Sequence, residues 1–215
     1  VMLHRGVPYL FILLLTLPAS IFLVRLFIFF HDCCHGSFFP SPRANRILGR
    51  LLGVLFFTSF DEFRYTHGRH HATVGDLDRR GTGDVWTLTA REYREAPRYK
   101  RIAYRVYREP LVMFGLGPLF TFLGVNLIPD RKLGWPRFWG VIKNDIGIAI
   151  VATTLCLTIG WKTYLFIQLP VILIAGMIGI WLFYVQHQFE PSYWARHEEW
   201  DSVEAALQGS SFYRL

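Results

Sequence analysis

The segment YLFILLLTLPASIFLVRLFIFF, residues 9–30, runs directly into the histidine-containing sequence HDCCH, residues 31–35. Residues 9–30 are nearly all apolar and are long enough for an α-helix to cross a hydrocarbon core of roughly 30 Å. The single charged residue, Arg25, lies near the end of the segment, from where its side chain can reach the membrane surface. The sequence therefore predicts an all-α integral membrane protein with a transmembrane helix at residues 9–30.

Four further segments complete the predicted organisation. Residues 47–60 are apolar but short and contain Arg50, which favours a helix at the membrane interface. Residues 61–109 are polar and basic and are expected to form a cytosolic cap. Residues 111–128 are uncharged and rich in Gly and Pro, and we expect an interfacial or re-entrant segment. Residues 146–186 hold two apolar blocks and are expected to form a transmembrane hairpin.

The charge distribution supports this assignment. The formal net charge is +7, and 18 of the 23 Lys and Arg residues lie between His31 and Asn144. Long uncharged apolar segments flank this basic region, which excludes a nucleic-acid-binding domain. Positive residues collect on the cytoplasmic side of membranes, so the region between the spans is predicted to face the cytoplasm.

Six of the eight histidines occur next to apolar segments. His31 and His35 are four residues apart, His67, His70 and His71 form the pattern H-x-x-H-H, and His187 ends the last apolar segment. On a helix, residues three and four apart share a face, so each group can present imidazoles to one point. Neutral imidazole suits iron, zinc and copper. A lone histidine near a membrane is more often a packing residue, but the clustering favours metal ligands.

Some other residues allow a simpler interpretation. His4 and His197 lack histidine neighbours in the sequence and are expected at the surface. Cys33 and Cys34 are adjacent, so both thiols cannot easily face one metal, and we expect small buried residues instead.

Three stretches resemble the membrane fatty-acid desaturases of the bacterial acyl-lipid type: HDCCHGSFF (31–39), HGRHHATVGDLDRRGTGDVW (67–86) and WLFYVQHQFEPSYW (181–194). The resemblance extends from about Arg25 to Leu215. It implies a single membrane desaturase domain, built as a transmembrane helix bundle with a cytosolic histidine-rich cap. It also implies integral insertion in a bacterial inner membrane, with the active site facing the cytoplasm.

The resemblance further implies two non-haem iron ions, O2 as co-substrate and acyl chains of membrane lipid as substrate. The metal ligands would be His31, His35, His67, His70, His71 and His187. An unactivated C–H bond offers no acidic proton to a base, so a bound cofactor has to carry the difficult step. The sequence contains neither a G-x-S-x-G motif nor any other recognisable nucleophile with a paired base.

Several other side chains are candidates for supporting roles. Asp32, inside the first motif, can orient an imidazole, and Asp61 with Glu62 can do the same before the second motif. The polar stretch after His71 is expected to order the cap, to contact a head group or to be a solvated loop; its charged members are Asp76, Asp78, Arg79, Arg80 and Asp84. Four aromatic residues are expected in an interfacial belt or along an acyl tunnel: Trp86, Trp181, Tyr184 and Trp194.

Desaturases of this type carry a third histidine box, another H-x-x-H-H, beyond the point where Leu215 ends this sequence. A fragment is therefore expected, lacking part of a two-iron site and inactive by itself. Electrons would come from a separate ferredoxin or b-type cytochrome, docking on a basic face with Arg79, Arg80, Arg98, Lys100 and Arg101. Binding of anionic lipid head groups explains these cations equally well. The alternatives are a related hydroxylase or carotenoid ketolase and, from another class, a histidine-rich metal transporter.

Overall fold

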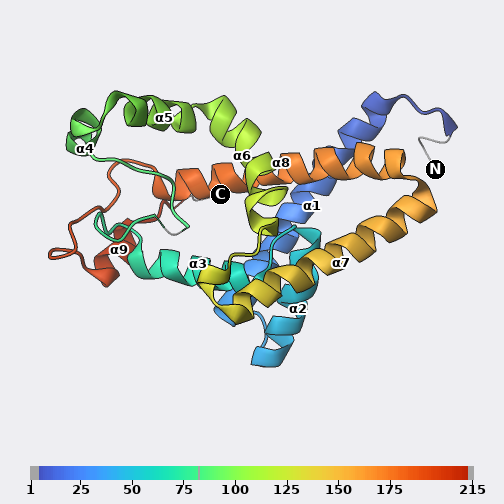
Figure 1. Ribbon diagram of the computed structural model, residues 1–215, viewed down its shortest axis with the longest axis horizontal. Coiled ribbons are helices and arrows are strands. Elements are labelled where there is room, and N and C mark those ends of the chain that lie inside the picture. Colours follow the sequence, from blue (N-terminus) through green and yellow to red (C-terminus); the bar gives the residue numbers. More distant parts are fainter. Residues whose placement is uncertain (1–4, 82, 213–215) are drawn as a thin grey trace. The chain divides into compact units, whose positions relative to one another are not determined.

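The computed structural model describes residues 5–81 and 83–212, and all regular elements in these ranges are helices (Figure 1). The chain forms two compact units. One comprises Val1–Arg64 and Gly115–Gly179, and the other Tyr65–Phe114 and Ile180–Leu215. The first unit holds most of the apolar helices, and the second holds the segments around the second histidine motif and His187.

Helix α1, Tyr9–His35, extends beyond the predicted segment 9–30 and includes the first histidine motif in its last turn. Nothing in HDCCH breaks a helix, whereas Gly36 does: it has φ 72°, a left-handed conformation that glycine adopts without strain. The Gly36 N–H donates to the carbonyl of Cys33, and the Ser37 N–H to that of Asp32. His31 and His35 are thus fixed at the end of a membrane-length helix.

Helix α2, Pro42–Leu55, begins and ends five residues before the predicted 47–60 segment. Pro42 lies in the first turn, where its missing N–H costs no helical hydrogen bond, so it starts the helix instead of breaking it. The hydroxyl of Ser41 caps this end by accepting from the Ala44 N–H at 3.4 Å.

Aromatic side chains hold α1, α2 and the start of α3 together. Phe30, Phe56 and Phe60 are buried, and the Phe30 ring centroid lies 5.6 Å from that of Phe56 and 5.9 Å from that of Phe60. Cys33 and Cys34 are buried in the same cluster, as expected for small core residues. Helix α3, Phe60–Thr73, then carries the H-x-x-H-H motif.

The segment predicted as interfacial or re-entrant is irregular. It consists of the π-helix η2 (Leu111–Leu116), α6 (Gly117–Phe122) and the 3₁₀-helix η3 (Val125–Leu127). The polar region before it contains α4 (Ala90–Glu95) and α5 (Arg98–Arg108), and α9 (Ser202–Gln208) lies near the C-terminal end. Repeated Gly and Pro residues explain why residues 111–128 do not form one continuous α-helix.

Two long helices follow the 3₁₀-helix η4 (Arg131–Leu133): α7 (Trp135–Ile159) and α8 (Trp161–His187). Only Gly160, with φ 86°, separates them. Helix α7 begins at Trp135 and includes the basic residues Arg137 and Lys143. The reason is that Pro136 lies in the first turn and no helix breaker follows before Gly160. Helices α1, α7 and α8 are long and apolar enough to cross a membrane.

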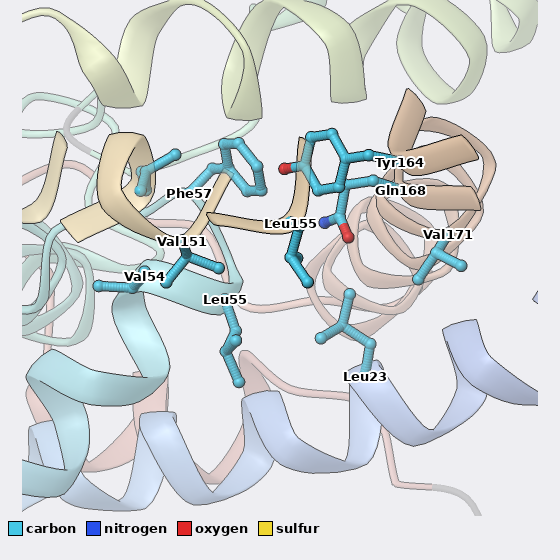
Figure 2. A pocket seen from close by; sticks show the side chains of 10 residues that line it. Leu23, Val54, Leu55, Phe57, Val151, Leu155, Tyr164, Gln168 and Val171 are labelled. Carbon is cyan, nitrogen blue, oxygen red and sulfur yellow. The ribbon is translucent and has the colours of Figure 1, made fainter. Parts of the chain in front are cut away.

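A cavity of about 140 Å³ lies inside the first unit (Figure 2). Its lining comes from α1, α2, α7, α8 and the α2–α3 connection and is apolar except for Tyr164 and Gln168; the other lining residues are Leu23, Val54, Leu55, Phe57, Ile148, Val151, Leu155 and Val171. The four aromatic residues predicted for a belt or tunnel do not line this cavity.

The tight packing around α2 predicts the effect of adding a methyl group at Gly53. A Cβ at Gly53 would lie 2.5 Å from the carbonyl oxygen of Thr58 and 3.2 Å from Oδ1 of Asn144. The first contact is with backbone, which cannot rotate away, so Gly53→Ala is expected to destabilise the chain by about 1–3 kcal/mol. Thermal unfolding of the purified protein in detergent measures this. In Gly179→Ala a Cβ meets nothing within 4 Å, and this control should be unchanged or slightly more stable.

Candidate metal centre

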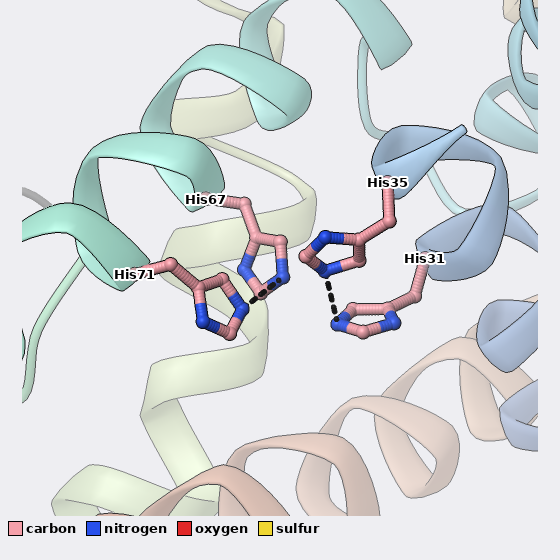
Figure 3. Close-up of side chains that lie close together, drawn as sticks. All are labelled: His31, His35, His67 and His71. Carbon is pink, nitrogen blue, oxygen red and sulfur yellow. Dashed lines mark hydrogen bonds between the residues drawn. The ribbon is translucent and has the colours of Figure 1, made fainter. Parts of the chain in front are cut away.

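The first histidine pair lies in the last turn of α1. The Nε2 atoms of His31 and His35 are 3.3 Å apart, as the four-residue spacing predicts (Figure 3). His31 is half-buried and His35 is exposed. Asp32 Oδ1 lies 3.5 Å from His31 Nδ1, which is long for a charge-assisted hydrogen bond. The proposed orienting role of Asp32 therefore stays a prediction.

The second pair lies on α3. The Nε2 atoms of His67 and His71 are 3.0 Å apart, and Figure 3 shows the two rings facing one another from adjacent turns. Ligand nitrogens bound about 2.0–2.1 Å from one metal lie roughly 3 Å from each other. Both pairs therefore have the nitrogen separation of neighbouring ligands in one coordination sphere, even before any rotation of the rings.

His70 and His187 form the third pair, and this pair is buried. Their Nε2 atoms are 3.2 Å apart, although 117 residues separate them in sequence. His70 is 2% exposed and His187 is 8% exposed. The pair packs against the ring of Phe183, whose centroid lies 5.2 Å from each imidazole centroid. The two imidazoles are thus held in a dry environment with the same nitrogen of each ring pointing to one place.

The remaining ring nitrogen of His70 is held by a carboxylate that the sequence did not single out for this role. Asp84 Oδ1 lies 2.5 Å from His70 Nδ1, and the Asp84 side chain is 8% exposed. The second oxygen of Asp84 accepts from the Gly81 N–H at 2.8 Å. Gly83, with φ 76°, allows the close approach, since a Cβ there would lie 3.3 Å from Cβ of His70. Asp84 was expected in a stretch that orders the cap, meets a head group or is solvated; it is a buried partner of the second motif.

The remaining nitrogen of His187 is held by backbone. His187 Nδ1 lies 2.9 Å from the carbonyl oxygen of Gly209, so Nδ1 donates and Nε2 is left as the acceptor. The chain after α9 is fixed against the last turn of α8, because the Ser211 N–H donates to the carbonyl of Gln186 and its hydroxyl to that of Val185. A second nitrogen fixed by a carboxylate or a carbonyl is the usual environment of a metal-binding histidine.

A strap formed by residues 193–201 packs against the segment that follows α3. The Leu77 N–H donates to the Ala195 carbonyl, and the Ala195 N–H donates to the Gly75 carbonyl, each at 2.9 Å. Asp76 is fully buried and accepts from its own turn and from His197 Nδ1 at 2.8 Å. His197 was expected at the surface; its side chain is 42% exposed, but it anchors this strap. His4 lies outside the described residues.

Asp78 strengthens the same strap. The backbone N–H of His197 and the guanidinium of Arg196 both bind its carboxylate, and they hold the pKa of Asp78 below its usual value. The strap therefore ties the end of α3, which carries His71, to the segment that follows His187.

Asp61, one of the two acidic residues before the second motif, accepts two hydrogen bonds of 3.1 Å from Arg50. Burial raises the pKa of Glu62, and the nearby Arg137 opposes this effect. Asp84 at His70 and Asp32 at His31, the latter at 3.5 Å, are carboxylates beside histidines of the motifs. A supporting role for Asp61 and Glu62 stays a prediction.

The Asp84 contact predicts a change in metal binding. Asp84→Asn keeps the size of the side chain but removes the carboxylate that fixes His70, and metal affinity is expected to fall about 10–100-fold. Titration of the purified chain with iron(II) or cobalt(II), followed by absorption or by metal analysis, measures this. Glu95→Gln removes an exposed carboxylate that pairs with Arg91, and it should leave the affinity unchanged. Equal affinity in Asp84→Asn and in the unmodified chain would contradict the assignment.

Known proteins resemble this chain along nearly its whole length. The profile of the fatty acid desaturase family matches residues 7–215. A fatty acid desaturase of Bacillus subtilis is 47% identical over 213 residues, covering 99% of this chain and 60% of that protein. An sn-1 acyl-lipid omega-3 desaturase (ferredoxin) of a Nostoc species is 26% identical, over 85% of this chain and 52% of that protein.

An omega-3 fatty acid desaturase of Caenorhabditis elegans is 24% identical over 88% of this chain and 48% of its own length. The chain thus spans between about half and three-fifths of these relatives. It belongs to the fatty acid desaturase family.

Proposed function

We propose that this chain is part of a membrane enzyme that introduces double bonds into acyl chains of membrane lipid, using O2 and a non-haem di-iron site. The observation that carries the proposal is the buried pair His70–His187, in which Asp84 and the Gly209 carbonyl fix the outer nitrogens. Such a pair has little use in packing alone, because burying imidazole nitrogens costs free energy unless each has a partner.

The six histidines of the three motifs are proposed as iron ligands: His31, His35, His67, His70, His71 and His187. The donor set is all imidazole in three pairs, each with nitrogens 3.0–3.3 Å apart, which fits octahedral or tetrahedral coordination. The irons, when bound, would supply the reduction of O2 and the abstraction of hydrogen from the acyl chain. The protein's own residues would bind the metals, hold the ring orientations and exclude water.

Residues around the buried pair serve water exclusion and orientation. Phe183 covers both imidazoles, and the carboxylate of Asp84 fixes the tautomer of His70 by accepting from its Nδ1. The Gly209 carbonyl does the same for His187. In a neutral ring with Nδ1 fixed in this way, Nε2 is the nitrogen left to bind a metal.

The substrate and partners follow from the membrane and from the relatives. Three apolar helices favour a lipid acyl chain over a water-soluble substrate. Two relatives, from Nostoc and Synechocystis, are named as acyl-lipid desaturases that use ferredoxin. We propose a separate electron donor of that kind, and insertion in the bacterial inner membrane with the histidine motifs on the cytoplasmic side, where the basic residues are expected.

The proposal is tested in a host that makes only saturated acyl chains. The longest gene product containing this chain is expressed with iron and a ferredoxin system, and lipid-derived fatty acids are analysed by mass spectrometry. Unsaturated product is expected, and His70→Gln should reduce it by at least about 100-fold, because a cooperative site fails when one ligand is lost. Protein levels in the membrane are matched, and Glu95→Gln serves as the control that retains activity.

The products also separate the alternatives. Hydroxylated fatty acids or oxidised carotenoids would identify the related hydroxylase or ketolase. Metal uptake without any change in lipid would identify a transporter. Either result, with an equal amount of membrane-inserted protein, would overturn the desaturase proposal.

A further inference from the structure

Helix α5, Arg98–Arg108, is a strongly basic element outside the metal centre. It carries five cations and no acidic residue within its bounds: Arg98, Lys100, Arg101, Arg105 and Arg108. The nearest acids in sequence are Glu95 and Glu109, one on each side. None of its residues is buried, so the helix lies at the surface of its unit.

One face of α5 is packed against the protein. The Tyr104 ring centroid lies 5.3 Å from that of Trp86 and 5.8 Å from that of Tyr93. Arg108 donates to Oε1 of Gln188 at 2.8 Å and to the hydroxyl of Tyr184 at 3.2 Å. Tyr184 lies in the last turn of α8, so Arg108 fixes one end of α5 to the end of a membrane-length helix.

The opposite face of α5 exposes apolar side chains. Tyr99, Ile102 and Val106 have the i, i+3, i+7 spacing of one helical stripe and are 75%, 52% and 52% exposed. Arg98 and Arg105 border this stripe, because they lie four residues before and three residues after Ile102 on the helix. The next helical segment begins with Leu111, which is 79% exposed.

We propose that α5 lies in the plane of the membrane surface, with Tyr99, Ile102 and Val106 among the outer acyl carbons and its exposed cations, Arg98, Lys100 and Arg105, on anionic phospholipid head groups. Three observations converge: a net charge of one sign, an exposed apolar stripe, and attachment to the end of the membrane-length helix α8. An acidic soluble electron donor would match the charge but would leave the apolar stripe without a role. The inference depends on membrane insertion and not on the desaturase reaction.

Photo-crosslinking tests this orientation. Benzoylphenylalanine replaces Ile102 on the exposed stripe, or Tyr104 on the packed face, in the full chain reconstituted into vesicles of phosphatidylglycerol and phosphatidylethanolamine. After illumination, mass spectrometry is expected to find lipid adducts from position 102 and protein adducts from position 104. The same group at Phe22, 71% exposed on α1, is the positive control for lipid contact.

The same experiment measures whether α5 prefers anionic phospholipid head groups. Replacing phosphatidylglycerol with phosphatidylcholine should lower the adduct yield at position 102 several-fold and leave that at position 22 unchanged. The double variant Arg98→Gln/Arg105→Gln should remove most of this difference. Absence of lipid adducts at position 102, while position 22 labels normally, would overturn the proposal. A protein adduct from position 102 in native membranes would overturn it in favour of donor docking.

Discussion

The architecture depends on a conflict between the membrane and the imidazole group. A helix in lipid must be apolar along its length, whereas a histidine needs a hydrogen-bond partner or a metal. The chain satisfies both demands by placing its histidines at helix ends: His35 is the last residue of α1 and His187 is the last residue of α8. The helix supplies rigidity, and the polar segments that follow supply hydrogen bonds to the rings of His70 and His187.

Those polar segments are short and are joined to the histidines and to one another by hydrogen bonds. Asp84 holds His70 from the stretch after α3, and Gly209 holds His187 from the stretch after α9. The strap around Ala195 joins the region after His187 to the region after His71 through backbone and side-chain hydrogen bonds. The ring orientations therefore depend on Asp84, which lies near the end of the stretch 67–86, and on Gly209, which lies outside the three motif stretches.

The difference between contacts set by helical spacing and contacts made by loops explains how much the sequence could predict. The helical character of the motifs and the pairing of His31 with His35 follow from local spacing, since 3.6 residues per turn leaves little freedom. The pairing of His70 with His187 joins residues 117 apart, and only the resemblance to desaturases suggested that they act together. Asp84 and Gly209 could not be predicted, because contacts made by loops have no periodic signal. The predicted segment 47–60 missed the start of α2 at Pro42, because the apolar pattern on which it rests begins later than the helix, which starts at a first-turn proline.

The proposed metal centre uses imidazoles, and not the nearby thiols of Cys33 and Cys34, as its ligands. X-ray absorption at the iron edge of the purified, iron-loaded gene product tests it directly. In the unmodified protein we expect the nearest atoms around iron to be nitrogen and oxygen, with the multiple scattering that imidazole rings give and with no sulfur. A sulfur shell about 0.2–0.3 Å farther out than the nitrogen shell, as thiolates give in metal sites, would contradict it.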